Sequence, residues 1–184
     1  MYPHRLAKLA VAFLYLLITI SPSSAARAAD GGALTISSSA FADGAAIGRE
    51  FSCDGTGGSP PLSWSNVPET TRSFVLIVSD PDAPHGTFYH WVIFNLPAQT
   101  RTLAAGAPTT ETLADGADQG FNSARRIGYT APCPPRGPAH HYHFKLYALD
   151  SMLALKPGET VETVESAISG HVLASAELVG VFGH

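Results

Sequence analysis

Three groups of polar residues lie next to apolar strands in this sequence, and their side chains are of kinds that bind small ligands. The first is the run Asp80-Pro81-Asp82-Ala83-Pro84, which follows the apolar segment 74–78. The second is His90, which precedes the apolar residues 92–94, and the third is His140 with Tyr142 at the start of segment 140–148. Carboxylate, imidazole and phenol groups together can form a site for an anion or a polar headgroup.

Strand periodicity predicts which of these side chains meet, because successive side chains of a strand point to opposite faces. Asp80 then shares a core face with residues 74, 76 and 78, and His90 shares one with residues 92, 94 and 96. His140 and Tyr142 share the face of residues 144, 146 and 148. If the three strand ends are neighbours, the four polar groups converge on one pocket. The alternative is a set of unrelated polar residues at strand ends.

Metal binding and nucleophilic hydrolysis are alternative interpretations of the same region. Asp80 and Asp82 with nearby histidines are of the types that bind metals, but their spacing matches no compact metal motif. His141 and His143 would also lie on the opposite strand face from His140. Ser79 is a serine beside a carboxylate, but no Gly-x-Ser-x-Gly sequence surrounds it, and it faces away from Asp80. An anion or headgroup site is therefore the preferred interpretation.

Composition favours one mostly-β domain. The chain has 184 residues, enough to bury a core, with 45% hydrophobic and 14% charged residues. Its 17 Gly and 14 Pro indicate many turns, which suits an all-β fold. The net charge is −4 and Arg125-Arg126 is the only basic doublet, so the sequence disfavours nucleic acid as a partner.

The N-terminal segment has the pattern of a secretory signal peptide. Arg5 and Lys8 precede the mostly apolar run 9–20, which is too short to span a bilayer of about 30 Å. Small residues at Ala26 and Ala28 predict cleavage after Ala28, with Ala26 as second choice. We therefore expect a signal peptide at 1–28 and a single domain at 29–184, exported to the periplasm or outside the cell without a transmembrane anchor. The alternative is an uncleaved N-terminal anchor.

Cys53 and Cys133 are the two cysteines of the chain. In an exported protein a disulfide between them is one interpretation, since such compartments are oxidising. The alternative is a pair of buried thiols near the pocket.

The remaining elements follow from periodicity and turn residues. Segments 34–41, 62–64 and 173–182 are expected to be strands, 51–53 a short extended piece, and 98–128 a long connection with little regular structure. Val161, Val164, Ala167 and Ile168 recur at helical spacing, and Gly170 is a natural stop, which predicts one short helix.

Several ordered motifs closely resemble the phosphatidylethanolamine-binding protein family, in its bacterial branch described as Raf-kinase-inhibitor-like. The motifs are Phe51-Ser52-Cys53-Asp54-Gly55, Ser59-Pro60-Pro61-Leu62-Ser63-Trp64, Asp80-Pro81-Asp82-Ala83-Pro84, His90-Trp91-Val92, Asn95-Leu96-Pro97, Gly128-Tyr129, Pro132-Cys133-Pro134-Pro135-Arg136-Gly137, His140-His141-Tyr142-His143-Phe144 and Tyr147-Ala148-Leu149-Asp150. The resemblance extends from about residue 34 to the end of the sequence. It implies a β-sandwich-like core with one or two short peripheral helices.

The resemblance also implies a ligand site. At the matching positions Asp80, His90, His140 and Tyr142 would line an anion pocket, and Pro134 and Phe88 would form its walls. The expected function is non-enzymatic binding of a small phosphorylated or zwitterionic ligand, without a cofactor. One alternative is a secreted inhibitor that docks on a protease or another enzyme through the pocket rim. Another is a weak metal-dependent phosphoester hydrolase. The kinase label is not carried over, because an exported protein has no Raf kinase to meet.

Overall fold

The computed structural model describes residues 32–184. The predicted signal peptide, residues 1–28, lies outside the described residues. Within residues 32–184, no helix is both long enough and apolar enough to cross a membrane.

Two antiparallel sheets form the domain, which confirms the mostly-β prediction. The larger sheet has five strands, in the spatial order β6 (Asp118–Gln119), β4 (Phe88–Pro97), β3 (Ser73–Asp80), β7 (His140–Leu149) and β8 (Val172–Phe182). The smaller sheet has three strands, in the order β1 (Thr35–Ser37), β2 (Leu62–Ser65) and β5 (Thr102–Leu103). A short 3-10 helix, η1 (Arg49–Phe51), and one α-helix, α1 (Val161–Ile168), complete the elements.

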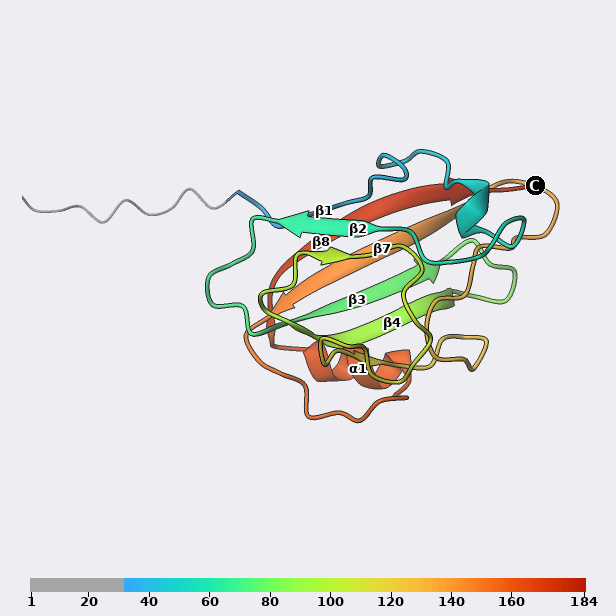
Figure 1. The fold of residues 1–184 in the computed structure, drawn as a ribbon. Helices are drawn as coiled ribbons and strands as arrows, with labels where there is room; N and C mark the ends of the chain where they lie inside the picture. Colours follow the sequence, from blue (N-terminus) through green and yellow to red (C-terminus); the bar gives the residue numbers. More distant parts are fainter. Residues whose placement is uncertain (1–31) are drawn as a thin grey trace, which may run out of the picture. The chain divides into compact units, whose positions relative to one another are not determined.

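The larger sheet lies between the smaller sheet and α1 (Figure 1). Each face of this sheet therefore packs against a separate apolar cluster. On one side Phe74 of β3 packs edge-on against Trp64 of β2, with ring centroids 5.6 Å apart. On the other side Val75 and Val92 pack in a cluster with Val164 of α1. All eight residues of β3 are buried, which explains why its residues 74–78 are all apolar instead of alternating.

The helix α1 occupies the residues that the helical spacing predicted. Its buried residues are Val161, Val164 and Ile168, and the Thr160 side chain accepts a hydrogen bond from the Thr163 N–H at the N-terminus. Such a cap supplies a partner for one of the free N–H groups of the first turn. The buried stripe then holds α1 against the larger sheet.

Strand β4 departs from simple alternation, and the predicted face of His90 is wrong for this reason. The pairing with β3 jumps from Leu96 to Ile93 and again from Trp91 to Tyr89, so β4 carries an extra residue at each place. Each bulge shifts the alternation by one residue. Leu96 consequently lies in a different apolar cluster from Val92, and His90 lies beside the Tyr142 ring instead of beside Val92.

Two further expectations need correction. The strand expected at 34–41 is only Thr35–Ser37, because the Ser38 hydroxyl donates to the Pro61 carbonyl and accepts from the Ala40 N–H, which bends the chain. Segment 51–53 is not extended as a whole, because Phe51 ends η1, Ser52 alone has an extended backbone and Cys53 begins a turn. There the Ser52 hydroxyl donates to the Arg49 carbonyl at 2.9 Å, which favours the turn.

The long connection 98–128 has little regular structure, as expected, apart from β5 and β6. The fully buried Gln119 fixes it to the larger sheet: its oxygen accepts from the Trp91 indole at 2.6 Å, and its amide donates to the Pro108 and Thr110 carbonyls. One amide side chain thus holds a segment that has few ladder hydrogen bonds of its own.

The outer edge of β8 is partly covered by segment 43–47. The Ile47 N–H donates to the Val181 carbonyl, and the Val181 N–H donates to the Ala45 carbonyl. The Asp43 carboxylate accepts from the Val179 N–H across a separation of 136 residues. Covering an edge in this way removes unpaired N–H and C=O groups that would otherwise pair with another chain.

Candidate functional site

One end of the larger sheet brings the predicted site residues together. Because β3 is antiparallel to both β4 and β7, the end of β3 lies beside the starts of the other two strands. A cavity of about 190 Å³ lies there, and all six predicted ligand-binding residues line it: Asp80, Phe88, His90, Pro134, His140 and Tyr142.

Asp80 and His140 form a buried hydrogen-bonded pair. The His140 Nδ1 atom lies 2.7 Å from Asp80 Oδ2, and the Asp82 N–H donates to Asp80 Oδ1 at 2.9 Å. An ionised carboxylate only accepts hydrogen bonds, so Nδ1 of His140 carries the proton. The Nε2 atom of His140 is therefore the ring nitrogen that remains for a ligand.

His90 is oriented in the same manner by a backbone carbonyl. Its Nδ1 atom donates to the Thr130 carbonyl at 2.7 Å, which again leaves Nε2 for a ligand. Burial lowers the pKa of His90 below its usual value, although the Thr130 hydrogen bond and the Asp80 charge act in the opposite direction. Without a ligand, His90 is accordingly a neutral imidazole at pH 7.

Tyr142 brings a hydroxyl group to the site that has no hydrogen-bond partner within residues 32–184. The side chain is only 1% exposed, and its ring lies edge-on to His90 with centroids 5.1 Å apart. Burial raises the pKa of the Tyr142 hydroxyl well above its usual value, and the nearby Asp80 and Asp82 carboxylates raise it further. The hydroxyl therefore stays protonated and can donate a hydrogen bond. A buried polar group without a partner is uncommon, and because Tyr142 lines the cavity, its hydroxyl is a candidate donor to a ligand or water there.

The cavity walls are rigid and apolar. The Phe88 ring lies against His90, with centroids 4.7 Å apart, and Pro84, Pro134 and Pro135 also line the cavity. Proline fixes φ, so these walls lose little conformational entropy when a ligand binds.

A disulfide joins Cys53 to Cys133 at this cavity. Cys133 is itself a lining residue and immediately precedes Pro134. The bond thus links one cavity wall to the turn that follows η1.

The rim loop that follows Asp80 is attached to β7 by a second Asp–His pair. The Asp82 carboxylate accepts from both the backbone N–H and Nδ1 of His141, at 2.9 and 2.7 Å. These hydrogen bonds lower the pKa of Asp82. His85, on the same loop, is exposed and does not line the cavity. His143 pairs with Glu177 instead, at 2.8 Å.

A metal site would need several ligand atoms close together. In the described part of the chain, the group of three that meets this condition is Cys53, Cys133 and His184, with ligand atoms within 4.8 Å of one another. Both sulfur atoms are in the disulfide, and a thiolate, not a disulfide sulfur, is the usual metal ligand. The geometry of Asp80, His90 and His140 instead suits hydrogen bonding to a ligand.

Sequence reasoning missed the contribution of Thr130. Its carbonyl orients His90, its N–H donates to the His90 carbonyl, and its hydroxyl accepts from the Asn122 amide. No sequence pattern marks a backbone carbonyl as an orienting group, so this role depends on the tertiary arrangement.

Comparison with known proteins shows that the chain is similar to members of one protein family. The family model described as phosphatidylethanolamine-binding protein matches residues 37–183. A protein from Methanothermobacter thermautotrophicus named UPF0098 protein is 45% identical over 149 residues, which cover 81% of this chain and 98% of that protein. The "Putative lipoprotein LppC" of Mycobacterium tuberculosis is 41% identical over 165 residues, which cover 89% of this chain and 78% of that protein.

Two solved structures share the fold. CT736 from Chlamydia trachomatis has a TM-score of 0.76 and 43% identity, and the match covers 83% of this chain and 98% of that one. YbcL from E. coli, whose structure is described as that of a new member of the mammalian PEBP family, has a TM-score of 0.77 and 31% identity. That match covers 82% of this chain and 98% of YbcL.

Proposed function

We propose, since the chain belongs to the phosphatidylethanolamine-binding protein family, that it is an exported, non-enzymatic binding protein for a small phosphorylated or zwitterionic ligand. The ligand would occupy the cavity at the joint end of β3, β4 and β7. Asp80, His90, His140 and Tyr142 would supply its polar contacts, and Phe88 and Pro134 its walls.

The observation that carries this proposal is the unpartnered Tyr142 hydroxyl. It is a protonated donor on a side chain that is only 1% exposed and lines the cavity. His90 and His140 line the same cavity, and because each uses Nδ1 for a hydrogen bond within the protein, each has Nε2 left for a ligand. When protonated, both Nε2 atoms donate, and three donors around one small cavity suit the oxygens of a phosphate or a similar anion.

The size of the cavity limits the ligand. About 190 Å³ is below the range of roughly 300–1,000 Å³ typical of sites for drug-sized molecules. A phosphomonoester or a headgroup such as phosphoethanolamine is of suitable size, whereas the acyl chains of a lipid would have to remain outside.

Export to the periplasm or the extracellular space is supported by the signal-like pattern of residues 1–28 and by the relative that is named a lipoprotein. The Cys53–Cys133 disulfide agrees with an oxidising compartment.

Native mass spectrometry tests the proposed ligand class. The purified protein is titrated with phosphoethanolamine, inorganic phosphate and divalent metal ions, beside Asp80→Ala and His140→Ala. A one-to-one phosphate-type adduct that disappears in both variants supports the proposal. His143→Ala is the matched control, because His143 lies on the same strand but pairs with Glu177 away from the cavity. Unchanged phosphate binding in both site variants, or turnover of a phosphoester, would contradict a non-enzymatic site here.

A further inference from the structure

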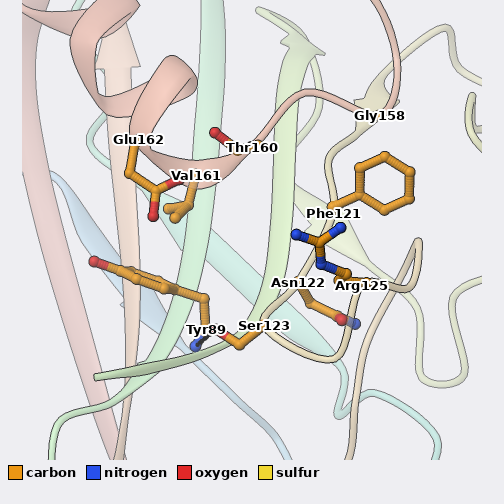
Figure 2. Close-up of a pocket in the computed structure, with 9 residues that line it drawn as sticks. All are labelled: Tyr89, Phe121, Asn122, Ser123, Arg125, Gly158, Thr160, Val161 and Glu162. Atoms are coloured by element: carbon orange, nitrogen blue, oxygen red, sulfur yellow. Dashed lines mark hydrogen bonds between the residues drawn. The ribbon is translucent and has the colours of Figure 1, made fainter. Parts of the chain in front are cut away.

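A second and larger cavity, of about 650 Å³, lies beside the start of α1 (Figure 2). It is lined by Tyr89 of β4, by segment 121–125 and by segment 158–162. Tyr89 and His90 are neighbours in sequence but serve different cavities, and the two cavities have no lining residue in common. This volume falls within the range for drug-sized ligands.

Two aromatic rings give the second cavity apolar walls. Phe121 is 42% exposed, so much of its ring faces the cavity or solvent, and Tyr89 is half-buried. Gly158 lies under the Phe121 ring with φ at +80°, and a Cβ atom there would come within 3.3 Å of the ring. A glycine at this position thus accommodates the ring close to the chain, and Val161 supplies buried apolar surface at the helix start.

Opposite charges lie on different sides of the hollow. Arg125 extends from segment 121–125, and Glu162 extends from the first turn of α1 (Figure 2). Neither side chain has an ion-pair partner in the described part of the chain, and they do not pair with each other. Both charges are therefore available to a ligand that carries the complementary charges.

The backbone fixes the position of Arg125. Its φ is +58°, in the left-handed region that residues other than glycine rarely adopt. The turn is held by the Arg125 N–H, which donates to the Asn122 carbonyl, and by the Asn122 side chain, which bonds to Gly128, Thr130 and the Arg126 N–H. The energetic cost of this conformation is thus met by a fully bonded, buried asparagine.

We propose that this second cavity binds a short zwitterionic peptide, of two or three residues, with an aromatic side chain. The side chain of the N-terminal residue would pack on Tyr89, on the Glu162 side of the cavity, and that of the C-terminal residue on Phe121, on the Arg125 side (Figure 2). The terminal carboxylate would pair with the Arg125 guanidinium, whose planar fork suits a carboxylate, and the terminal ammonium would pair with Glu162. This inference is independent of the anion site proposed above.

Titration calorimetry with the full chain and defined dipeptides tests this site. The probes are phenylalanyl-leucine, its N-acetylated form and its C-terminal amide. We expect the free dipeptide to bind, and each blocked form to bind about three- to tenfold more weakly, as for the loss of one partly exposed charge-assisted contact. No binding of the free dipeptide at millimolar concentration would overturn the proposal.

Paired variants assign each contact. Glu162→Gln is expected to weaken binding of the free dipeptide three- to tenfold and to leave binding of the N-acetylated form unchanged. Arg125→Gln is expected to do the same for the free dipeptide and to spare the amide. Glu165→Gln and Arg126→Gln are matched controls, because both residues are exposed and neighbouring but do not line the cavity.

Two results would overturn the proposal by showing that the dipeptide binds elsewhere on the protein. One is dipeptide binding that none of these variants changes. The other is dipeptide binding that is lost in Tyr142→Phe or displaced by phosphoethanolamine, which would place the peptide in the smaller cavity. Thermal unfolding of each variant is measured to check that it is folded under the conditions of the titration.

Discussion

The Tyr142 hydroxyl is a group whose removal should affect binding and stability in different directions. Tyr142→Phe removes a buried polar atom that has no partner in residues 32–184. Because an unsatisfied buried group costs about 1–3 kcal/mol, we expect the free energy of unfolding to stay the same or rise. Phosphoethanolamine affinity should fall about tenfold, since a hydrogen bond to a charged oxygen contributes about 1.5 kcal/mol or more. Denaturant unfolding and calorimetry measure the two effects.

Tyr147→Phe is the control for this substitution. Tyr147 lies on the same strand but packs in the apolar cluster on the α1 side of the sheet, so its hydroxyl does not reach the anion cavity. We expect phosphate binding to be unchanged. A clear loss of stability in Tyr142→Phe would mean that the hydroxyl has a partner in the unliganded protein, contrary to our interpretation.

His90 gives the anion site a pH dependence. Burial keeps the pKa of His90 below its usual value, so the free protein holds a neutral ring at pH 7. An anion favours the protonated ring, so binding takes up a proton, and affinity should rise as the pH falls from 8 towards 5.5. The groups that face His90 are Asp80, which favours protonation, and His140, which opposes it. Calorimetry in buffers of different ionisation enthalpy counts the proton.

His90→Asn tests whether the proton taken up on binding belongs to the His90 ring. The asparagine amide can still donate to the Thr130 carbonyl, so the segment should keep its position. We expect the variant to bind phosphate more weakly at pH 6 and to lose part of the pH dependence. Affinity that increases with rising pH would contradict the assigned protonation state of the ring.

At the scale of elements, the sequence was most informative where alternation or helical spacing is regular. Segments 74–78, 140–148, 173–182 and 161–168 all lie in the elements that their patterns predict. The faces of β4 could not be predicted, because the two bulges depend on how β4 pairs with β3. His90 reaches the cavity because of one of these bulges, so strand alternation predicted the correct residue on an incorrect face.

Asn95 lies at one of these bulges and gives a test of how β4 is held. Its φ is +57°, and its side chain both donates to the Leu153 carbonyl and accepts from the Leu153 N–H. We expect Asn95→Ala to lower the free energy of unfolding by about 2–4 kcal/mol, through backbone strain and two unsatisfied buried groups. Denaturant unfolding measures the loss.

Asn66→Ala is the matched control for Asn95. Asn66 has a similar φ of +56°, but it is exposed and makes one long hydrogen bond to the Ala33 carbonyl. A loss of about 1 kcal/mol is expected there from the strain alone. Equal losses in the two variants would show that the Leu153 contacts contribute nothing.

The disulfide joins two irregular parts of the chain: Cys53 lies in the turn after η1, and Cys133 lies in a loop outside both sheets. Closing a separation of 80 residues contributes about 4 kcal/mol in the chain-entropy model. The double variant Cys53→Ser with Cys133→Ser should unfold at clearly lower denaturant concentration and bind phosphate more weakly, because Cys133 lines the anion cavity. Adding a dithiol reductant to the wild type should have the same effect, and an unchanged midpoint in both cases would contradict this role.

At the scale of the whole molecule, the smaller cavity, which is the proposed anion site, could be predicted from the sequence, whereas the second cavity could not. Asp80, His90, His140 and Tyr142 belong to three long strands, and adjacent strand ends bring them together. The second cavity is lined by one residue of β4 and by two segments that are mostly irregular and far apart in sequence. Neither periodicity nor composition predicts how such segments meet.

Export can be tested on the whole chain. We expect the protein recovered from outside the cytoplasm to begin at Ala29, because Ala26 and Ala28 supply the small residues that precede cleavage. N-terminal sequencing checks this. Replacing Ala28 with leucine should slow processing and leave the longer precursor, and an exported protein that still begins at Met1 would support the uncleaved anchor instead.

The cover that segment 43–47 places on β8 has a consequence for how fast the domain can form. The contact of Asp43 with the Val179 N–H closes a separation of 136 residues, and β3 is also paired with the distant β7. Domains dominated by such distant pairings fold in milliseconds to seconds, because the entropy of closing long loops is lost before the contacts form. Until these pairings are made, the edge of β8 is free to associate with other chains, so aggregation during refolding should increase with protein concentration.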